Sequence, residues 1–389
     1  MGAGRRMLLR RLYEAALSGV DPEEAVARAL SRPAVKRALA GPGAGTKARE
    51  VGILAVGKAA AGMTRGARRA APRGRALVIL PRGSSSRGLA GARVLFAAHP
   101  QPDASSVRAA RAALRFFGSF GPDDAILCLI SGGASSLLAL PRPGITLAQK
   151  RRAVAALSRA GAPIRELNRL RIRLSAVKGG GLGRATRARL VTLVLSDVPG
   201  DRATLVGSGP TIRDRRRRRR SGDLVRVVAS NADGIRAAAR EARRAGLRVA
   251  AAPRLAGEAR LMGRRLARAA RALAPETLLL AGGETVVALG RTRRRGGRSL
   301  ELALSLAIAL DGAGAAWLAA GSDGRDGSSP AAGAFADGRT AARARRLGLD
   351  AAGALRLHDT HSFFERLGDL WAPGETGTNV GDWVFLYRF

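Results

Sequence analysis

The sequence predicts an α/β protein with two domains, and three observations lead to this prediction. Its 389 residues exceed the size at which one hydrophobic core usually stops growing, so two domains are expected. Hydrophobic residues make up 46% of the chain, which is enough to build those cores. Short β-branched or leucine-rich runs alternate with longer helical patterns, and this alternation is typical of parallel α/β sheets.

Nine short apolar runs are the candidate strands, because each combines strand-forming residues with a length of a few residues. They are VGILAV (51–56), ALVIL (76–80), RVLFA (93–97), AILCLI (125–130), RLVTLVL (189–195), LVRVVA (224–229), LRVAAA (247–252), TLLLA (277–281) and AAWLAA (315–320). Helical patterns follow most of them, for example at 104–117 and 231–246. In the second pattern, Ser230 or Asn231 is a suitable N-cap and Gly246 a C-terminal stop.

A domain boundary is expected near 272–277, where an Arg/Ala-rich helical pattern ends at Pro275 and a new strand begins. The predicted domains are therefore 1–274 and 275–389. The RDRRRRRR run (213–220) lies inside the first predicted domain. It is a block of mostly positive charges that cannot pack. We predict a solvated loop there, with an anion-docking arm as the alternative.

The net charge of +39 would by itself suggest a nucleic-acid partner. Biased composition explains this charge better, since the arginines are spread over the whole chain while only five lysines and three asparagines remain. Aromatic residues make up only 4%, and no RNA-binding signature occurs among them. We therefore expect no specific nucleic-acid partner.

Features of membrane and secreted proteins are missing from the sequence. The longest apolar runs are too short to span a bilayer, and the N-terminus carries charges where a signal peptide needs an apolar centre. The single cysteine, Cys128, lies inside a candidate strand and offers no disulfide framework. The sequence thus predicts a cytoplasmic protein without a membrane partner, and it does not reveal the oligomeric state.

Four glycine-rich turns follow predicted strands, within the segments 51–63, 125–138, 277–287 and 315–327. Backbone N–H groups and a helix dipole at such a turn attract anions. One turn of this kind is often only steric, but four favour a polyanionic small ligand, most simply a nucleotide. The fingerprint G-x-G-x-x-G does not follow any of the strands, which argues against a dinucleotide.

Carboxylates stand at two of these strand ends and at the end of the candidate strand 189–195. Asp197 lies in LSDVPGD, Glu284 in GGET and Asp323 in GSDGRDG. Oxygen ligands of this type, together with phosphates, bind Mg²⁺. Each carboxylate by itself could equally be a turn residue, but in combination with the glycine-rich turns they favour phosphoryl transfer.

These motifs resemble those of the glycerate 2-kinases of the MOFRL type, some of which carry the older label hydroxypyruvate reductase. The matching segments occur in the family's order, cover nearly the whole chain and include all three asparagines, together with Lys58 and Lys178. They are VGKAAAGM (56–63), HPQPDASS (99–106), LISGGASSLL (129–138), NRLRIRLSAVKGG (168–180), SDVPGDRATLVGSGPT (196–211), SNADGIRAAAREARRAG (230–246), AGGETVVALG (281–290), RGGRSLELAL (295–304), AAGSDGRDGSSPAAGAFADG (319–338) and ETGTNVGDWV (375–384).

The resemblance implies two α/β domains with parallel-rich sheets: a larger, Rossmann-like N-terminal domain and a smaller C-terminal MOFRL domain. It places the active site in the cleft between them. It implies transfer of the γ-phosphoryl group of ATP to the 2-hydroxyl of D-glycerate, with Mg²⁺. Lys58 and Arg298 match the family's catalytic lysine and arginine, and Asp197 and Asp323 match aspartates expected to bind the metal or, for Asp197, to take part in catalysis.

The remaining expected site residues bind substrate or nucleotide. They are Ser131, Gly132, Gly133, Lys178, Asn231, Gly282, Gly283 and Glu284. Of the five arginines in 291–304, only Arg298 is expected to function, because it follows two glycines and opens an amphipathic helix. The other four are predicted to lie in a solvated loop, and Arg325, between two aspartates, is predicted to be replaceable.

The chain departs from the family's pattern at a few positions. Ala134 replaces a glycine, Leu300 replaces an amide residue, and Glu375 lies in a glycine-rich loop. These departures keep open the alternative of a catalytically impaired member. A hydroxypyruvate reductase is the other alternative, and it would need a nicotinamide site.

Overall fold

The computed structural model describes residues 1–40, 48–70, 74–160, 164–213, 222–288 and 294–389. These residues form two compact units. The first, here called the central unit, is Asp21–Ala229. The second, here called the terminal unit, combines Met1–Val20 with Ser230–Phe389.

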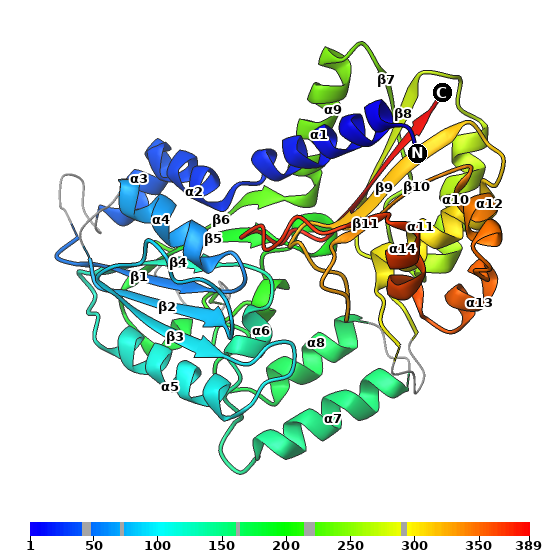
Figure 1. The fold of residues 1–389 in the computed structure, drawn as a ribbon. Helices are drawn as coiled ribbons and strands as arrows, with labels where there is room; N and C mark the ends of the chain where they lie inside the picture. The colour runs from blue at the N-terminus through cyan, green and yellow to red at the C-terminus, as the bar shows by residue number, and fades with distance from the viewer. Residues whose placement is uncertain (41–47, 71–73, 161–163, 214–221, 289–293) are drawn as a thin grey trace. The chain divides into compact units, whose positions relative to one another are not determined.

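The central unit is built on a six-stranded sheet with the order β3-β2-β1-β4-β5-β6 (Figure 1). Strands β1 to β5 pair in parallel, as the strand–helix alternation predicted. The order is that of a doubly wound Rossmann-type sheet, whose ligands bind where the strand order reverses. The strands are β1 (Val51–Val56), β2 (Ala76–Pro81), β3 (Ala92–Ala97), β4 (Ala125–Ile130), β5 (Arg189–Ser196) and β6 (Leu224–Ser230).

Helices cover both faces of this sheet. Side chains alternate between the faces of a strand, so Leu54 and Val56 of β1 point into the core beneath α5 (Ala104–Gly118). Helix α4 (Ala60–Ala70) packs against β1 and β2 on the opposite face (Figure 1). The other helices of the unit are α2 (Pro22–Ser31), α3 (Pro33–Leu39), α6 (Ala134–Leu137), α7 (Leu147–Arg159) and α8 (Ile164–Arg173), with single 3₁₀ turns at Gly183–Ala185, Pro199–Asp201 and Val206–Ser208.

The terminal unit has a second six-stranded sheet, with the order β11-β10-β9-β12-β8-β7. The prediction of a parallel-rich sheet is wrong here, because β12 runs antiparallel to both β8 and β9, and β10 runs antiparallel to β9 and β11. Only β7 and β8 pair in parallel. The strands are β7 (Arg248–Ala251), β8 (Thr277–Gly283), β9 (Ala315–Gly321), β10 (Gly333–Asp337), β11 (Leu370–Trp371) and β12 (Asp382–Arg388).

The core of the terminal unit lies between this sheet and the helices α10 and α11, with Trp317, Leu304 and Phe364 fully buried in it. Helices α1 and α9 pack on each other and on strands of the same sheet. The helices are α1 (Ala3–Gly19), α9 (Asn231–Arg244), α10 (Ala259–Arg271), α11 (Arg298–Ala309), α12 (Thr340–Arg346), α13 (Ala351–Arg356) and α14 (Thr360–Leu367).

The limits of the two units differ from the predicted boundary after residue 274. Tyr13 of α1 explains part of the difference, because its ring packs edge-on against Trp371 and Trp383 at centroid distances of 5.7 and 5.8 Å. Its buried hydroxyl also donates to the carbonyl oxygen of Gly321 at 2.9 Å. These contacts span most of the sequence, so no local composition shift could indicate that α1 belongs with the C-terminal sheet.

All nine predicted strands are confirmed, and so are both quoted helices. Helix α9 is capped by Ser230, and Gly246 follows its end with φ at +78°. Strands β10, β11 and β12 were not predicted.

The prediction of a solvated loop at 213–220 is wrong for Arg213. Its guanidinium donates to the Ala188 carbonyl at 2.6 Å and pairs with Asp223. The rest of that run, with Arg291 and Arg293, lies outside the described residues. In the portion of the chain that the structure covers, no helix is long and apolar enough to cross a membrane.

Candidate active-site residues

Lys58, the Ser131–Gly133 turn and Asp197 all follow strands of the central sheet at the same edge. Val56, Ile130 and Val194 lie in one row across β1, β4 and β5, so the residues that follow them leave the sheet together. Between β1 and β4 the strand order reverses. The structure therefore brings three sequence-predicted groups to the place where doubly wound sheets bind ligands.

Two of these turns are held against each other by Ser131. A Cβ on Gly57, whose φ is +129°, would lie 2.1 Å from the Ser131 Oγ, so only glycine allows this approach. The Ser131 hydroxyl accepts the Ala59 N–H at 3.1 Å, and its amide donates to the Val56 carbonyl at 3.0 Å. Lys58 N–H in turn donates to the Gly132 carbonyl at 3.0 Å. The amide and hydroxyl of Ser131 thus position the turns.

Gly132 and Gly133 have backbone amides that donate to none of the described residues. A Cβ on Gly133, where φ is +86°, would stand 3.1 Å from the His99 ring and 3.4 Å from Cγ of Lys58. The half-buried Lys58 side chain, the His99 ring and this turn therefore lie side by side. Two unused N–H donors next to a lysine provide the chemistry that a phosphate or carboxylate needs.

Lys178 is buried at 3% exposure, a few residues after α8. Its Nζ donates to the carbonyl oxygen of Ser135 at 2.5 Å and to its hydroxyl at 2.6 Å. Burial lowers the pKa of Lys178 well below its ordinary value, and the charges of Lys150 and Arg171 lower it further. Lys178 therefore belongs to a cationic environment next to the Gly132–Gly133 turn.

Arg298 is the centre of the polar group in the terminal unit. Its Nε and Nη2 donate to the two carboxylate oxygens of Asp382 at 2.5 and 3.0 Å, and its Nη1 lies 2.7 Å from Glu284. Gly283, Asp382 and Gly321 lie in one row across β8, β12 and β9. Glu284 and Asp323 follow the ends of that row, so the predicted residues of this unit gather at one edge of its sheet.

The electrostatics of this edge favour a fixed positive charge on Arg298. Burial alone would lower the pKa of its guanidinium, but Asp382 and Glu284 outweigh burial and hold that pKa well above its usual value. A bidentate carboxylate also fixes the plane and direction of the guanidinium. Burial raises the pKa of the Tyr13 hydroxyl, and the nearby Asp323 and Asp382 raise it further, so Tyr13 stays neutral.

The first turn of α11 is capped by Asp326, which is 2% exposed. Its carboxylate accepts the N–H groups of Ser299 and Leu300 at 3.1 and 2.8 Å. A Cβ on Gly297 would lie 2.3 Å from this carboxylate, which explains the glycine before Arg298. Arg298 opens the helix as predicted, but these two N-terminal amides are already satisfied by the chain's own aspartate.

Burial raises the pKa of Asp326 to about 7, with a further contribution from Asp382. In an unfolded chain an aspartate has a pKa of about 3.9, so between these values the folded state binds the extra proton and stability falls as pH rises. We expect Asp326→Asn to be stabilised relative to the parent protein as pH increases from 5 to 7, by up to about 1.4 kcal/mol per pH unit. Denaturant unfolding of both proteins across this range measures the difference, and a difference that stays constant with pH would contradict the assignment.

The backbone at this edge of the sheet is held in place by Asn231, Gly282 and Gly283. The Asn231 amide group donates to the carbonyl oxygens of Val380 and Asp382 at 2.9 and 3.1 Å. A Cβ on Gly282 would lie 2.0 Å from the Asn231 side chain, and one on Gly283 would lie 2.3 Å from the Leu255 carbonyl. These three residues hold the start of β12, and therefore Asp382, in place. Their predicted role in ligand binding stays a prediction.

Asp382 and Tyr13 were not among the predicted site residues. Asp382 lies in the matching segment ETGTNVGDWV, which was the one available signal, whereas nothing in the local sequence distinguishes Tyr13. Of the departures from the family's pattern, Leu300 is completely buried in the core of the terminal unit and Glu375 is exposed. Among the neighbouring arginines, Arg294 pairs with Asp359, and Arg325 is exposed.

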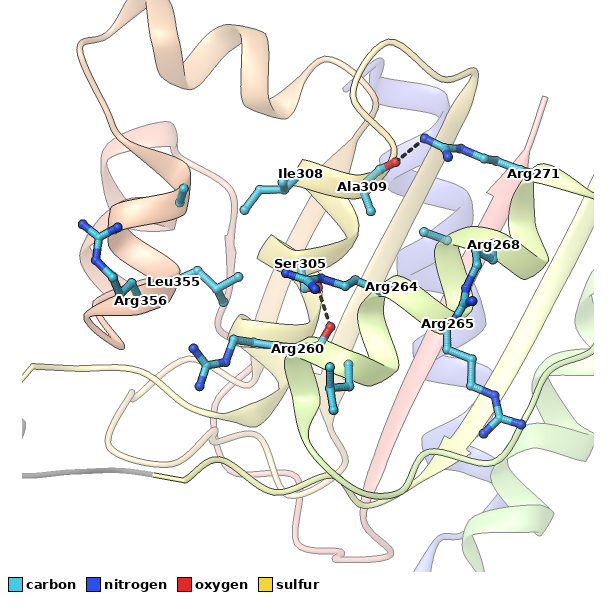
Figure 2. Close-up of a pocket in the computed structure, with 13 residues that line it drawn as sticks. Arg260, Arg264, Arg265, Arg268, Arg271, Ser305, Ile308, Ala309, Leu355 and Arg356 are labelled. Atoms are coloured by element: carbon cyan, nitrogen blue, oxygen red, sulfur yellow. Dashed lines mark hydrogen bonds between the residues drawn. The ribbon is translucent and has the colours of Figure 1, made fainter.

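Two other features bear on where ligands bind. In the described part of the chain, no three His, Cys, Asp or Glu side chains are grouped to hold a metal ion. A groove of about 980 Å³ lies along α10, α11 and α13 and is lined by arginines, among them Arg260, Arg264 and Arg268 (Figure 2). It contains none of the predicted site residues, so its volume alone does not identify a functional site.

Comparison with known proteins identifies the relatives of this chain. The family models DUF4147, a domain of unknown function, and MOFRL match residues 8–241 and 277–382. A protein of Agrobacterium vitis, provisionally named hydroxypyruvate reductase, is 36% identical over 97% of this chain and 93% of its own length. D-glycerate 2-kinase of Thermotoga maritima is 33% identical over 85% of this chain and 89% of its own length. The crystal structure of a glycerate kinase from the same organism matches all of both chains, with a TM-score of 0.85 and 30% identity. The chain therefore belongs to the glycerate 2-kinase family of the MOFRL type, which its motifs had indicated.

Proposed function

We propose that this protein is a glycerate 2-kinase, which transfers the γ-phosphoryl group of ATP to the 2-hydroxyl of D-glycerate. The observation that carries the proposal is the fixed guanidinium of Arg298, which donates two hydrogen bonds to the Asp382 carboxylate and contacts Glu284 at 2.7 Å. Phosphoryl transfer needs such a preorganised cation because charge develops on the transferred group. Relatives that carry the names D-glycerate 2-kinase and glycerate kinase support the choice of acceptor.

Lys58 and the amides of Gly132 and Gly133 suit an anionic group of the substrates in the central unit. Arg298 is aimed by Asp382 and stabilises the transferring phosphoryl group in the terminal unit. The carboxylates of Asp197 and Asp323 are suited to two tasks, coordination of Mg²⁺ and acceptance of the proton from the 2-hydroxyl. Mg²⁺ usually takes only one or two carboxylates in addition to phosphate oxygens and water, so a single aspartate is enough to hold it beside the phosphates of ATP. When bound with ATP, Mg²⁺ neutralises phosphate charge.

A phosphorus NMR experiment tests this function. The purified protein is incubated with Mg-ATP and D-glycerate, and we expect a 2-phosphoglycerate resonance to appear in step with ADP. A 3-phosphoglycerate resonance would correct the acceptor hydroxyl while keeping the reaction class. Absence of any phosphorylated product from folded protein would contradict the proposal and favour a catalytically impaired family member.

The name of the Agrobacterium vitis relative motivates one control. The same protein is mixed with hydroxypyruvate and reduced nicotinamide cofactor, and absorbance of the cofactor is followed. We expect no oxidation above background, because no dinucleotide fingerprint follows a strand in this chain. Steady oxidation that depends on the protein would favour the reductase.

A further inference from the structure

Three cations in the central unit, here called the cation cluster, are Lys150, Arg171 and Lys178. Lys150 lies on α7 at 5% exposure, and its Nζ has no hydrogen-bond partner among the described residues. Arg171 lies on α8, is half-buried, and pairs with none of the carboxylates in the described part of the chain. Helix α7 packs against α8 (Figure 1). Lys178 follows the end of α8 within a few residues. The cluster therefore concentrates positive charge without an acidic partner.

The charges in this cluster act on one another. Burial lowers the pKa of Lys150 to about 8, and Arg171 contributes to that shift. Burial also lowers the pKa of Lys178, as do the charges of both other members. A buried charge without a partner is costly, and like charges placed together add to the cost. Such an arrangement becomes favourable when an anion enters it.

Hydrogen-bond directions around Lys178 point to the same conclusion. An ammonium group only donates, so the Ser135 hydroxyl accepts from Lys178 and is left to donate to the Ser208 hydroxyl, 3.3 Å away. The Ser208 hydroxyl donates to Oδ1 of Asn168 at 2.7 Å. The Asn168 amide nitrogen is a donor in any case, and the hydrogen bond from Ser208 to Oδ1 fixes which side of the amide group that nitrogen occupies. Among the described residues, this site offers donors from Lys150 and Asn168, and the Nζ of Lys150 has no acceptor.

Composition gives an independent reason to consider Lys150 functional. The chain has five lysines among 68 basic residues, so arginine is the default cation almost everywhere. Two of those five lysines are buried in this one cluster. A compact ammonium group with three donors suits an enclosed anion site. On the solvated surface of this chain, lysine is not preferred to arginine.

We propose that the cation cluster, together with Asn168, binds a small oxyanion, either the carboxylate of the hydroxy-acid substrate or a phosphate group. The identity of the ligand rests on the proposed function, because both groups occur among the reactants of a glycerate kinase. Carboxylates and phosphates both accept charge-assisted hydrogen bonds from Lys and Arg, and they would supply the acceptors that the cluster lacks.

Binding to the full-length protein without nucleotide tests the site. D-glycerate, inorganic phosphate and glycerol are compared by calorimetric titration and by thermal unfolding. We expect at least one of the two anions to bind and to raise the melting temperature, and glycerol, which has hydroxyls but no carboxylate, to do neither. A response to D-glycerate alone assigns the site to the carboxylate, and a response to phosphate alone assigns it to the phosphate group. Competition between the two anions shows that both groups enter the same site.

Lys150→Met is expected to weaken anion binding by about tenfold or more, while its melting temperature without anion stays equal or rises because an unpaired buried charge is removed. Lys36→Met is the matched control, since Lys36 is exposed on α3 of the same unit. Asn168→Asp is a second variant that places a carboxylate beside the cations. It should be more stable than the parent protein without anion and should no longer respond to either anion.

Several outcomes would overturn the proposal. It fails if neither anion binds the parent protein, or if Lys150→Met and Asn168→Asp bind the anion as the parent protein does. These results are separable from the kinase assay, because binding is measured without ATP. Anion binding that depends on Lys150 in a protein without kinase activity keeps the site and removes the proposed function. If Lys150→Met keeps kinase activity and binds D-glycerate as the parent protein does, the proposed function stands and the anion site is removed.

Discussion

Arg298→Ala is expected to lower kcat for glycerate phosphorylation by about 10³-fold or more. The guanidinium is already oriented by the two hydrogen bonds that it donates to Asp382, so its charge needs no rearrangement when the phosphoryl group is transferred. Since this interaction would form mainly in the transition state, kcat should fall more than the affinity for either substrate. Steady-state kinetics with D-glycerate and Mg-ATP measure both quantities.

Controls for this variant address folding and local charge. Removal of Arg298 takes away the cation that pairs with the buried carboxylate of Asp382, which can destabilise the terminal unit. The double variant Arg298→Ala with Asp382→Asn also removes the carboxylate charge that Arg298 balances, so it should fold well and remain inactive. Arg325→Ala changes an exposed arginine in the loop between β9 and β10, and this variant should keep normal turnover. Near-normal turnover in folded Arg298→Ala would exclude the catalytic role.

Lys58→Ala is expected to have the second large effect, again about 10³-fold or more on kcat if it stabilises the transferred phosphoryl group as Arg298 does. Its side chain lies beside the Gly133 turn, whose amide and that of Gly132 are unused among the described residues. The backbone N–H of Lys58 donates to the Gly132 carbonyl at 3.0 Å, and alanine keeps this N–H, so the contact between the two turns should be retained.

The matched control for Lys58 is Lys36→Ala, which removes an exposed lysine from the same unit and should leave kcat unchanged. Measuring kcat and KM separately distinguishes two roles for Lys58. A rise in KM for one substrate with unchanged kcat would show that Lys58 only binds that substrate, and would contradict its role in the transition state.

Local signals explain why so much of the fold could be predicted. A strand such as AILCLI (125–130) is a continuous apolar run because both of its faces are buried in a parallel sheet. Helix α9 was predictable because its Ser230 cap and its terminal Gly246 act within a few residues of the helix. Strand β12 was missed because it is antiparallel and lies between β8 and β9, an order that nothing in its own seven residues indicates.

The candidate site divides in the same way. Lys58, Arg298 and the Gly132–Gly133 turn were predictable because each stands at a strand or helix end with glycine neighbours, a pattern visible in a few consecutive residues. Asp382 and Tyr13 were not predicted because their roles depend on contacts with residues 84 and 308 positions away in the chain. That the Nζ of Lys150 is buried without a hydrogen-bond partner among the described residues likewise becomes visible only when α7 and α8 are packed together.

The sequence by itself determined the class of fold, the positions of the first nine strands along the chain and the glycine-rich turns, because hydrophobic periodicity and backbone freedom are local properties. Only the tertiary structure decided which sheet α1 joins, which carboxylate holds Arg298, and that Asp326 caps the helix that Arg298 opens. These are pairings between distant residues, and their energy depends on burial and on distances of a few ångströms that no local pattern encodes.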